Sequence, residues 1–172
     1  MASKHDPRTT YPGYAVLTGA FLAGTGSAVA ELSRRRRLPV RFAFGDIMLL
    51  GVATYQLSRT ISRDRVTAFL REPFAKQAES AGRGEVESEA EGEGLRRAVG
   101  ELLICPFCMT QWVGAAFLLS LCAAPRTTRF AASLFALRTV AEVANVAHEA
   151  AVAAVDRRED TTKLTQRRES AA

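Results

Sequence analysis

The chain of 172 residues is long enough for one modest domain, and it carries a formal net charge of +5 with a pI of about 9.6. Its three cysteines lack the even number and the spacing of a disulfide framework, so a disulfide-stapled scaffold is excluded. A mean hydropathy of about zero averages segments of very different character, and these segments decide the class of the protein.

The first apolar segment, Tyr11 to Ala30, contains no charged residue and predicts a membrane-spanning helix. A helix of this length covers about 30 Å, the thickness of the hydrocarbon core of a bilayer. Small residues recur at every fourth position at Ala20, Gly24 and Ala28, a spacing typical of close helix contacts in membranes. A secretory signal peptide is the alternative, but the four arginines of 34–37 directly after the segment are typical of a membrane anchor.

The second segment, Phe42 to Ser58, is apolar apart from Asp46, and its uncharged part covers only Ile47 to Ser58. This part is too short for a regular span and predicts a re-entrant or interfacial helix. Ser62 to Phe74 follows as a basic amphipathic stretch. We expect it to lie on the anionic leaflet of the membrane or to form a solvated surface helix.

An acidic segment over residues 79–94 is rich in glutamate and glycine, with Val86 as its only large apolar residue. Because such a composition cannot bury a core, we expect a disordered linker. The linker would connect the basic stretch to the most apolar segment of the chain.

That segment, Leu102 to Ala124, contains no charge and predicts the second membrane span. Phe130 to Val155 is rich in alanine and helical in pattern, and four of its polar residues share one helical face. These residues are Arg138, Glu142, Asn145 and Glu149. Either the helix crosses with this face turned into a bundle, where Arg138 pairs with Glu142, or its second half leaves the lipid as a surface helix.

Together the segments predict an all-α fold, a small multi-pass membrane helical bundle with three spans, a re-entrant or interfacial helix and a disordered acidic linker. The expected regions are an N-terminal helix with a basic loop (1–41), a membrane domain (42–155) and a charged, frayed tail (156–172). The positive-inside rule places the acidic linker and the tail on the cytoplasmic side of the plasma membrane, whether or not 42–58 crosses. If 42–58 does not cross, the excess of basic residues on the cytoplasmic side over the outside is larger. The positive-inside rule therefore favours three spans.

The pair Cys105 and Cys108, with Pro106 between them, leaves three readings open. The cysteines could be small apolar residues at a helix entrance, where a proline costs nothing in the first turn. They could hold half of a zinc site shared between two chains, because zinc needs about four ligands and both histidines are far away in the sequence. They could also form a redox pair, for which Cys122 is no resolving thiol because it lies about 21 Å further along the helix.

Three blocks of the sequence form a recognisable pattern: Leu49–Arg59, Asp64–Pro73, and Gly100–Cys108 followed by Trp112. They resemble a family of small bacterial membrane proteins catalogued as domain of unknown function 1360. The resemblance covers Asp46 to Ala150, and the Cys-Pro-Phe-Cys block is its most specific part. The chain differs from the family pattern at Gln56, where a basic residue is usual, and after Cys108, where a glycine is usual. The resemblance implies a multi-pass membrane protein and implies no reaction, cofactor or catalytic residue.

The chemistry-bearing patterns favour a binding function over catalysis. The sequence has no Gly-rich phosphate loop, Ser/His/Asp set or paired-carboxylate site, so no catalytic residue is assigned. The leading hypothesis is a non-enzymatic integral membrane scaffold or partner-binding subunit, with the lipid bilayer, a second copy or another membrane protein as partner. The alternative is a membrane thiol redox or metal-dependent enzyme that uses Cys105 and Cys108. No nucleic acid partner and no cofactor other than the shared zinc is expected.

Overall fold

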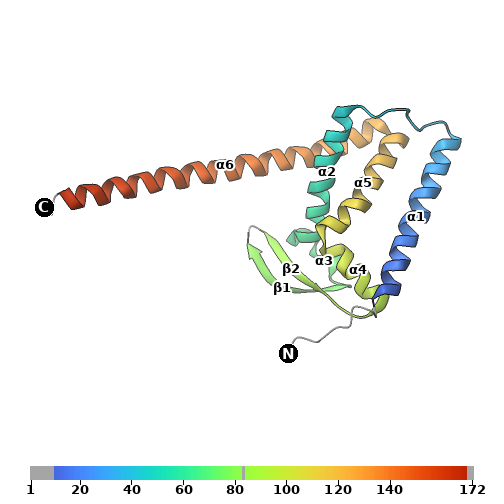
Figure 1. Ribbon diagram of the computed structural model, residues 1–172, viewed down its shortest axis with the longest axis horizontal. Coiled ribbons are helices and arrows are strands. Elements are labelled where there is room, and N and C mark those ends of the chain that lie inside the picture. Colours follow the sequence, from blue (N-terminus) through green and yellow to red (C-terminus); the bar gives the residue numbers. More distant parts are fainter. Residues whose placement is uncertain (1–9, 83, 170–172) are drawn as a thin grey trace. The chain divides into compact units, whose positions relative to one another are not determined.

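The computed structural model describes residues 10–82 and 84–169, and within these ranges the chain is mostly helical (Figure 1). The chain divides into two compact units, one up to Ala136 and the other from Leu137 onward. The elements in chain order are α1 (Tyr11–Arg34), α2 (Phe44–Arg63), the 3₁₀ turn η2 (Arg65–Thr67), α3 (Ala68–Arg71), β1 (Ala75–Gly82), β2 (Glu85–Ala90), α4 (Gly94–Ile104), α5 (Pro106–Ala123) and α6 (Pro125–Glu169).

The core of the first unit lies between α2 and α5. α5 buries a single stripe of residues at the four-residue spacing of one helical face: Met109, Val113, Phe117 and Leu121. Leu50 and Ala53 of α2 pack in the same cluster. Phe135 of α6 adds an edge-to-face contact with Phe117, with ring centroids 6.4 Å apart. The most apolar helix of the chain is therefore the centre of this unit.

α2 runs antiparallel to α5 (Figure 1). Asp46 at its start accepts hydrogen bonds of 2.7 and 2.8 Å from Arg129, which follows α5 in the chain. With 20 residues, α2 extends about 30 Å. α2 is thus longer than its uncharged part, Ile47 to Ser58, and its re-entrant or interfacial placement stays a prediction. The charged residues at the two ends of α2 find partners elsewhere in the chain and do not end the helix.

The loop after α1 meets the turn between α5 and α6. Arg36 adopts a left-handed φ of 53°, and the amide of Arg37 can then donate to the carbonyl of Leu32 at 2.9 Å, which closes the end of α1. The Arg37 side chain donates from Nη1 to the carbonyl of Ala123 at 2.8 Å. The contact places the loop after α1 beside the turn before α6, and whether 42–58 crosses a membrane stays a prediction.

Residues 79–94 do not form the expected disordered linker. Residues 79–82 and 85–90 belong to an antiparallel hairpin of β1 and β2, in which Ala75 pairs with Ala90. The sequence predicted an all-α fold. This prediction is wrong for the described chain, which contains the strands β1 and β2. The missed signal is the alternation Glu-Val-Glu-Ser-Glu-Ala over β2, which turns Val86 inward, 4% exposed, and leaves Glu87 and Glu89 outside.

Contacts with α2 and α4 explain why so polar a hairpin is ordered, since an isolated two-stranded hairpin is marginally stable at best. Arg59 donates from Nε to Glu85 at 2.9 Å, and Arg63 lies 3.7 Å from Glu87. On α4, a Cβ at Gly100 would lie only 2.5 Å from the backbone oxygen that precedes β1. The absence of a side chain at Gly100 therefore lets the hairpin lie directly on the helix.

Arg71 at the end of α3 is buried, only 1% exposed, and is not part of a basic surface. Its guanidinium donates to the carbonyls of Ile61 and Asp64 and so caps the end of α2. Burial lowers the pKa of Arg71 from its ordinary value. The exposed side chains of the segment are both apolar and charged: Val66, Phe69 and Leu70 beside Arg65 and Glu72. The basic amphipathic helix expected over 62–74 is thus two short turns with a mixed outer surface.

α4 and α5 are separate helices, with Cys105 between them in an extended conformation of φ −99° and ψ 104°. Pro106 has no backbone N–H and disfavours a helical conformation in the residue before it. The expectation that Pro106 stands in the first turn of the helix is confirmed, and the extension of that helix back to Leu102 is wrong. Residues 102–104 end α4, and α5 begins at Pro106.

Three helices in the described part of the chain are long and apolar enough to cross a membrane: Tyr11–Arg34, Pro106–Ala123 and Pro125–Arg157 within α6. They overlap the three segments that the sequence predicts as spans, Tyr11–Ala30, Leu102–Ala124 and Phe130–Val155. The backbone of α6 continues to Glu169, so the tail expected to be frayed from residue 156 is helical up to that point.

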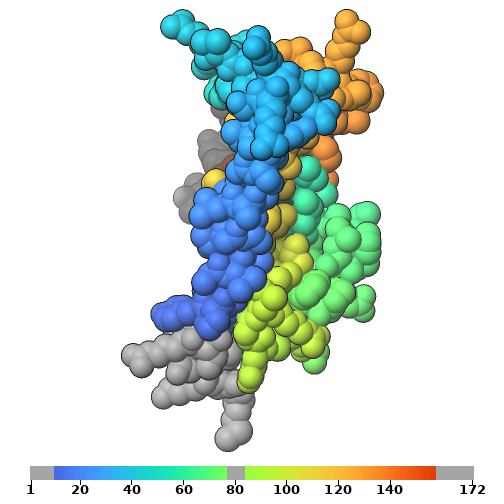
Figure 2. All heavy atoms as spheres, turned by 90° about the vertical axis from the view of Figure 1, so that its right-hand side faces the viewer, coloured from blue at the N-terminus to red at the C-terminus, as the bar shows by residue number. Residues whose placement is uncertain are grey.

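α1 packs on α4 near its N-terminus, where Gly13 is buried, and Figure 2 shows α1 in blue with α4 in yellow-green beside its lower end. A Cβ at Gly13 would lie 2.8 Å from both the Ala98 side chain and a backbone oxygen of α4. A Cβ at Gly24 would meet nothing within 4 Å. The centre of the small-residue stripe therefore makes no close contact with the described part of this chain.

Replacing Gly13 by alanine should destabilise the protein by about 1–3 kcal/mol, because the new methyl group overpacks the contact with α4. Gly19→Ala is the matched control, since a Cβ there meets nothing within 4 Å. That variant should be neutral or stabilised by up to about 1 kcal/mol through helix propensity. Thermal unfolding in detergent measures both changes. Equal stability of the two variants would contradict the contact between α1 and α4.

Candidate functional site

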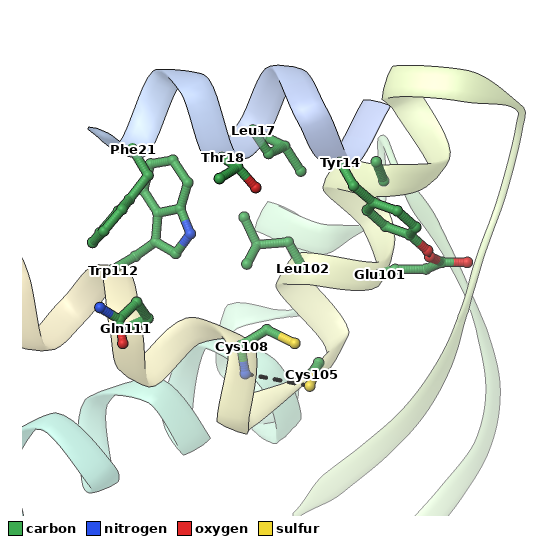
Figure 3. A pocket seen from close by; sticks show the side chains of 11 residues that line it. Tyr14, Leu17, Thr18, Phe21, Glu101, Leu102, Cys105, Cys108, Gln111 and Trp112 are labelled. Atoms are coloured by element: carbon green, nitrogen blue, oxygen red, sulfur yellow. Dashed lines mark hydrogen bonds between the residues drawn. The ribbon is translucent and has the colours of Figure 1, made fainter. Parts of the chain in front are cut away.

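A cavity of about 590 Å³ lies between α1, α4 and α5 (Figure 3). α1 contributes one helical face to it through Tyr14, Leu17, Thr18 and Phe21, which follow the three- and four-residue spacing of a helix. α4 contributes Glu101 and Leu102, and the two cysteines before and within α5 complete the lining with Gln111 and Trp112. All three helices belong to the first compact unit.

The position of α4 explains why this space is open. α1 contacts α4 at Gly13 and reaches α5 only further along, where Phe21 and Trp112 meet edge to face with centroids 5.2 Å apart. Between these two contacts, α4 keeps α1 away from the start of α5. The aromatic pair therefore bounds the cavity at one end, and α4 bounds it at the other.

Cys105 and Cys108 both line the cavity as free thiols. Cys105 is the N-cap of α5, and its Sγ accepts a hydrogen bond from the backbone N–H of Cys108 at 3.3 Å (Figure 3). A sulfur at this position lies beside the first backbone amides of α5. Cys122 lies at the other end of α5 beside Arg37 and Arg129. The structure thus separates a cysteine pair from a third cysteine that cannot reach it.

The α4 end of the cavity is polar. The Tyr14 hydroxyl donates to Glu101, and Arg97 donates from Nε to the other oxygen of the same carboxylate at 2.9 Å. Glu101 is therefore shared between α1 and its own helix, and it ties the N-terminal part of α1 to α4. Sequence reasoning missed Tyr14, Arg97 and Glu101. The four-residue spacing of Arg97 and Glu101 was a visible sign of pairing, but it did not point to Tyr14.

No group of three or more histidine, cysteine or acidic side chains in the described residues is placed to hold a metal ion. Zinc sites in proteins take about four ligands. A zinc ion at Cys105 and Cys108 would therefore need ligands from a second chain, as the sequence suggested, and this remains a prediction.

The predicted polar face on α6 lies in the second compact unit. Arg138 donates from Nε to Glu142 at 3.2 Å, and each side chain is 42% exposed. Asn145 and Glu149 follow on the same helix and are exposed. The pairing of Arg138 with Glu142 matches the geometry expected one helical turn apart, while the surroundings of this face in a membrane remain a prediction.

The Leu-Ser-Arg block of α2 has a structural role. Ser58 is buried, and Arg59 contacts both Tyr55 and Glu85, which fixes the start of β2 to α2. Gln56, where the resembling family usually has a basic residue, is fully buried in the same helix. This block therefore positions the hairpin and contributes nothing to the cavity lining.

Comparison with known proteins adds a family assignment to this geometry. The model of a family described as a protein of unknown function, DUF1360, matches residues 49–148. A protein of Bacillus subtilis strain 168 named sporulation protein YjcA is 29% identical over 100 residues, which cover 56% of this chain and 85% of that protein. No solved structure matches. The family match includes α4, the cysteine pair and Trp112, but it begins after α1.

Filling the cavity should protect its two cysteines from alkylation. In Thr18→Phe, a ring from α1 would occupy space beside Cys105 and Cys108, so a membrane-permeant maleimide should label both several-fold more slowly. Labelling of Cys122 should not change. Thr25→Phe, a threonine on α1 outside the cavity lining, is the matched control. Mass spectrometry of the labelled peptides gives the three rates, and equal labelling of the pair in Thr18→Phe and the parent would contradict the placement of both cysteines at the cavity.

Proposed function

The chain belongs to the family of proteins of unknown function DUF1360, and on this premise we propose that it is a non-enzymatic integral membrane protein of the bacterial plasma membrane that binds a partner. The observation that carries the membrane assignment is the outer surface of α1 and α6. Both helices are apolar along a membrane-length stretch, and almost none of either stretch is buried within the chain. Exposed apolar surface of this extent is stable in lipid and not in water.

The packing also supports a path across the bilayer. α1 and α5 run in the same direction, because Phe21 meets Trp112 and Arg37 meets Ala123 further along both helices. If both helices cross, the chain must return between them, and α2 is the helix long enough to do so. α2 therefore crosses although its charged ends lower its apolar character. Those ends lie where the polar head groups of the lipid would be.

The distribution of basic residues supports a cytoplasmic C-terminus. With α2 and α6 both crossing, the cytoplasmic side holds the basic residues before α1, those between Arg59 and Arg97, and those of the tail. The outside holds the loop after α1 and the turn before α6, which carry fewer. In this orientation the hairpin and the start of α5 face the cytoplasm, where thiols are kept reduced.

The partner-binding role rests on surfaces that the described chain does not cover. The polar face of α6 carries Arg138 and Glu142, and such groups inside a membrane face protein or water because lipid cannot solvate them. A second copy or another membrane protein would cover this face. The relative from Bacillus subtilis is named a sporulation protein, so that process is the first in which to seek the partner.

A thiol redox function is the second candidate, and one observation favours it. Cys105 and Cys108 are free, lie at a helix N-terminus and line a cavity, whereas cysteines that only pack need no open space beside them. Thiol content measured after acid trapping of growing cells separates the two candidates. A fully reduced pair under all conditions favours the binding protein, and a disulfide in a fraction of the molecules favours the redox protein.

Membrane integration predicts that the protein stays in the pellet after alkaline carbonate washing. A phosphatase fused after Ala172 should be inactive, because this enzyme needs an oxidising compartment outside the cytoplasm. A fluorescent protein fused at the same place should be bright. Release into the supernatant would overturn the membrane assignment, and an active phosphatase would overturn the orientation alone.

The partner should depend on the polar face of α6. A tagged full-length chain, purified in mild detergent from native membranes, should retain a second protein or a second copy of itself in fixed ratio. Glu142→Leu should lose it, because Arg138 would remain without its carboxylate in the interface, at a cost of about 3–5 kcal/mol if the pair is buried. Val143→Leu on the same helix should retain it. Equal retention by both variants, or no retained partner in the parent, contradicts this role.

A further inference from the structure

The cavity between α1, α4 and α5 has the size and lining of a small-molecule site. Its volume of about 590 Å³ lies within the range of roughly 300–1,000 Å³ that such sites occupy. Leu17 and Leu102 supply apolar walls, and the edge-to-face pair of Phe21 and Trp112 supplies aromatic surface at one end. A flat, apolar ring suits these walls because it can stack on or against the aromatic side chains.

Hydrogen-bond donors border the same space from two helices. Figure 3 shows Thr18 on α1 and Gln111 on α5, whose hydroxyl and amide groups can each donate to a carbonyl oxygen. The described lining contains no basic side chain, so an anionic ligand would find no cation to pair with there. The lining therefore fits a neutral ring with carbonyl groups better than a lipid phosphate or a saturated acyl chain.

Cys105 and Cys108 add a chemical function to this lining. Their three-residue separation at the start of α5 places the two sulfurs on one side of the helix, close enough to form a disulfide. Cys122 is at the other end of α5, so no further cysteine of the chain can enter the reaction. The site can thus give up two electrons once, by converting two thiols into one disulfide.

We propose that the cavity binds a membrane quinone and that Cys105 and Cys108 reduce it. This inference rests on the second candidate function and names its substrate class. Two S–H bonds break and one S–S bond forms. The two electrons and two protons released convert the quinone to its hydroquinone, so the pair is oxidised and the ring is reduced. A cytoplasmic dithiol then restores the pair by thiol–disulfide exchange and becomes a disulfide itself.

Two parts of the chain line the cavity and have different roles in this proposal. The family segment supplies the reducing cysteines, and α1 supplies residues that select the ligand. The cysteine pair and Trp112 lie within the segment matched by the family, whereas Thr18 and Phe21 lie on α1, outside that match. The reducing group is therefore on the family's common region, and residues of α1 select the ring that reaches it.

Binding can be measured without any redox step, because Trp112 is the only tryptophan of the chain and lines the cavity. A short-chain ubiquinone added to full-length protein in detergent should quench its fluorescence in a saturable way. The double variant Cys105→Ser/Cys108→Ser should show the same quenching, since it keeps the cavity. Thr18→Phe should lose saturable quenching, and Thr25→Phe should retain it.

Electron transfer is measured with protein that has been reduced and freed of reductant. One equivalent of the same quinone should yield close to one hydroquinone per chain by absorbance, with loss of both thiols of the pair. Cys105→Ser and Cys108→Ser should each abolish the reaction. Cys122→Ser should leave it unchanged and is the matched control, because it removes a cysteine outside the cavity.

The outcomes separate this proposal from the membrane and partner-binding functions. Quenching that does not saturate, or that is equal in Thr18→Phe and the parent, overturns the binding site. Saturable quenching that a phospholipid displaces, without thiol loss, overturns the redox step and identifies a lipid site. Neither result affects carbonate extraction or partner retention, which test the other functions on their own.

Discussion

Pro106 imposes the constraint on which the candidate site depends. Its ring removes a backbone donor and disfavours a helical conformation at Cys105, and α4 ends there while a new helix begins. Because α4 and α5 are then free to diverge, α4 can reach α1 at Gly13 while α5 reaches it only at Trp112. The same break makes Cys105 an N-cap residue with its sulfur beside the first amides of α5. The cavity and the cysteine geometry are therefore two consequences of one proline.

Charged residues hold the ends of the α2–α5 core together. At one end, Asp46 and Arg129 join the start of α2 to the chain beyond α5, and at the other, Arg59 and Glu85 join α2 to the hairpin. Ion pairs in water contribute little to stability, about 0–1 kcal/mol when exposed. The two pairs matter for the geometry of the core. The apolar stripe alone would allow α2 to slide along α5, and each pair fixes one end of α2 to its neighbour. This arrangement leaves the outer apolar surface of α1 exposed.

The two functional proposals use different surfaces of the molecule. Partner binding uses the polar face of α6 in the second compact unit, while ligand binding uses the cavity of the first unit. The family match contains the cysteine pair and leaves out α1.

The sequence by itself determined the membrane-length apolar helices and the pairing of Arg138 with Glu142, because these depend on composition and on contacts one helical turn apart. It also contained the local signals for a helix start at Pro106 and for the alternation in β2. Only the tertiary structure decided that α2 runs the length of α5, that Arg71 is buried and that Tyr14 reaches Glu101. Tyr14 and Glu101, like Arg59 and Glu85, lie far apart in the chain, and no local periodicity identifies a distant partner. The cavity likewise depends on which helices meet, so it became visible only once α1, α4 and α5 were placed together.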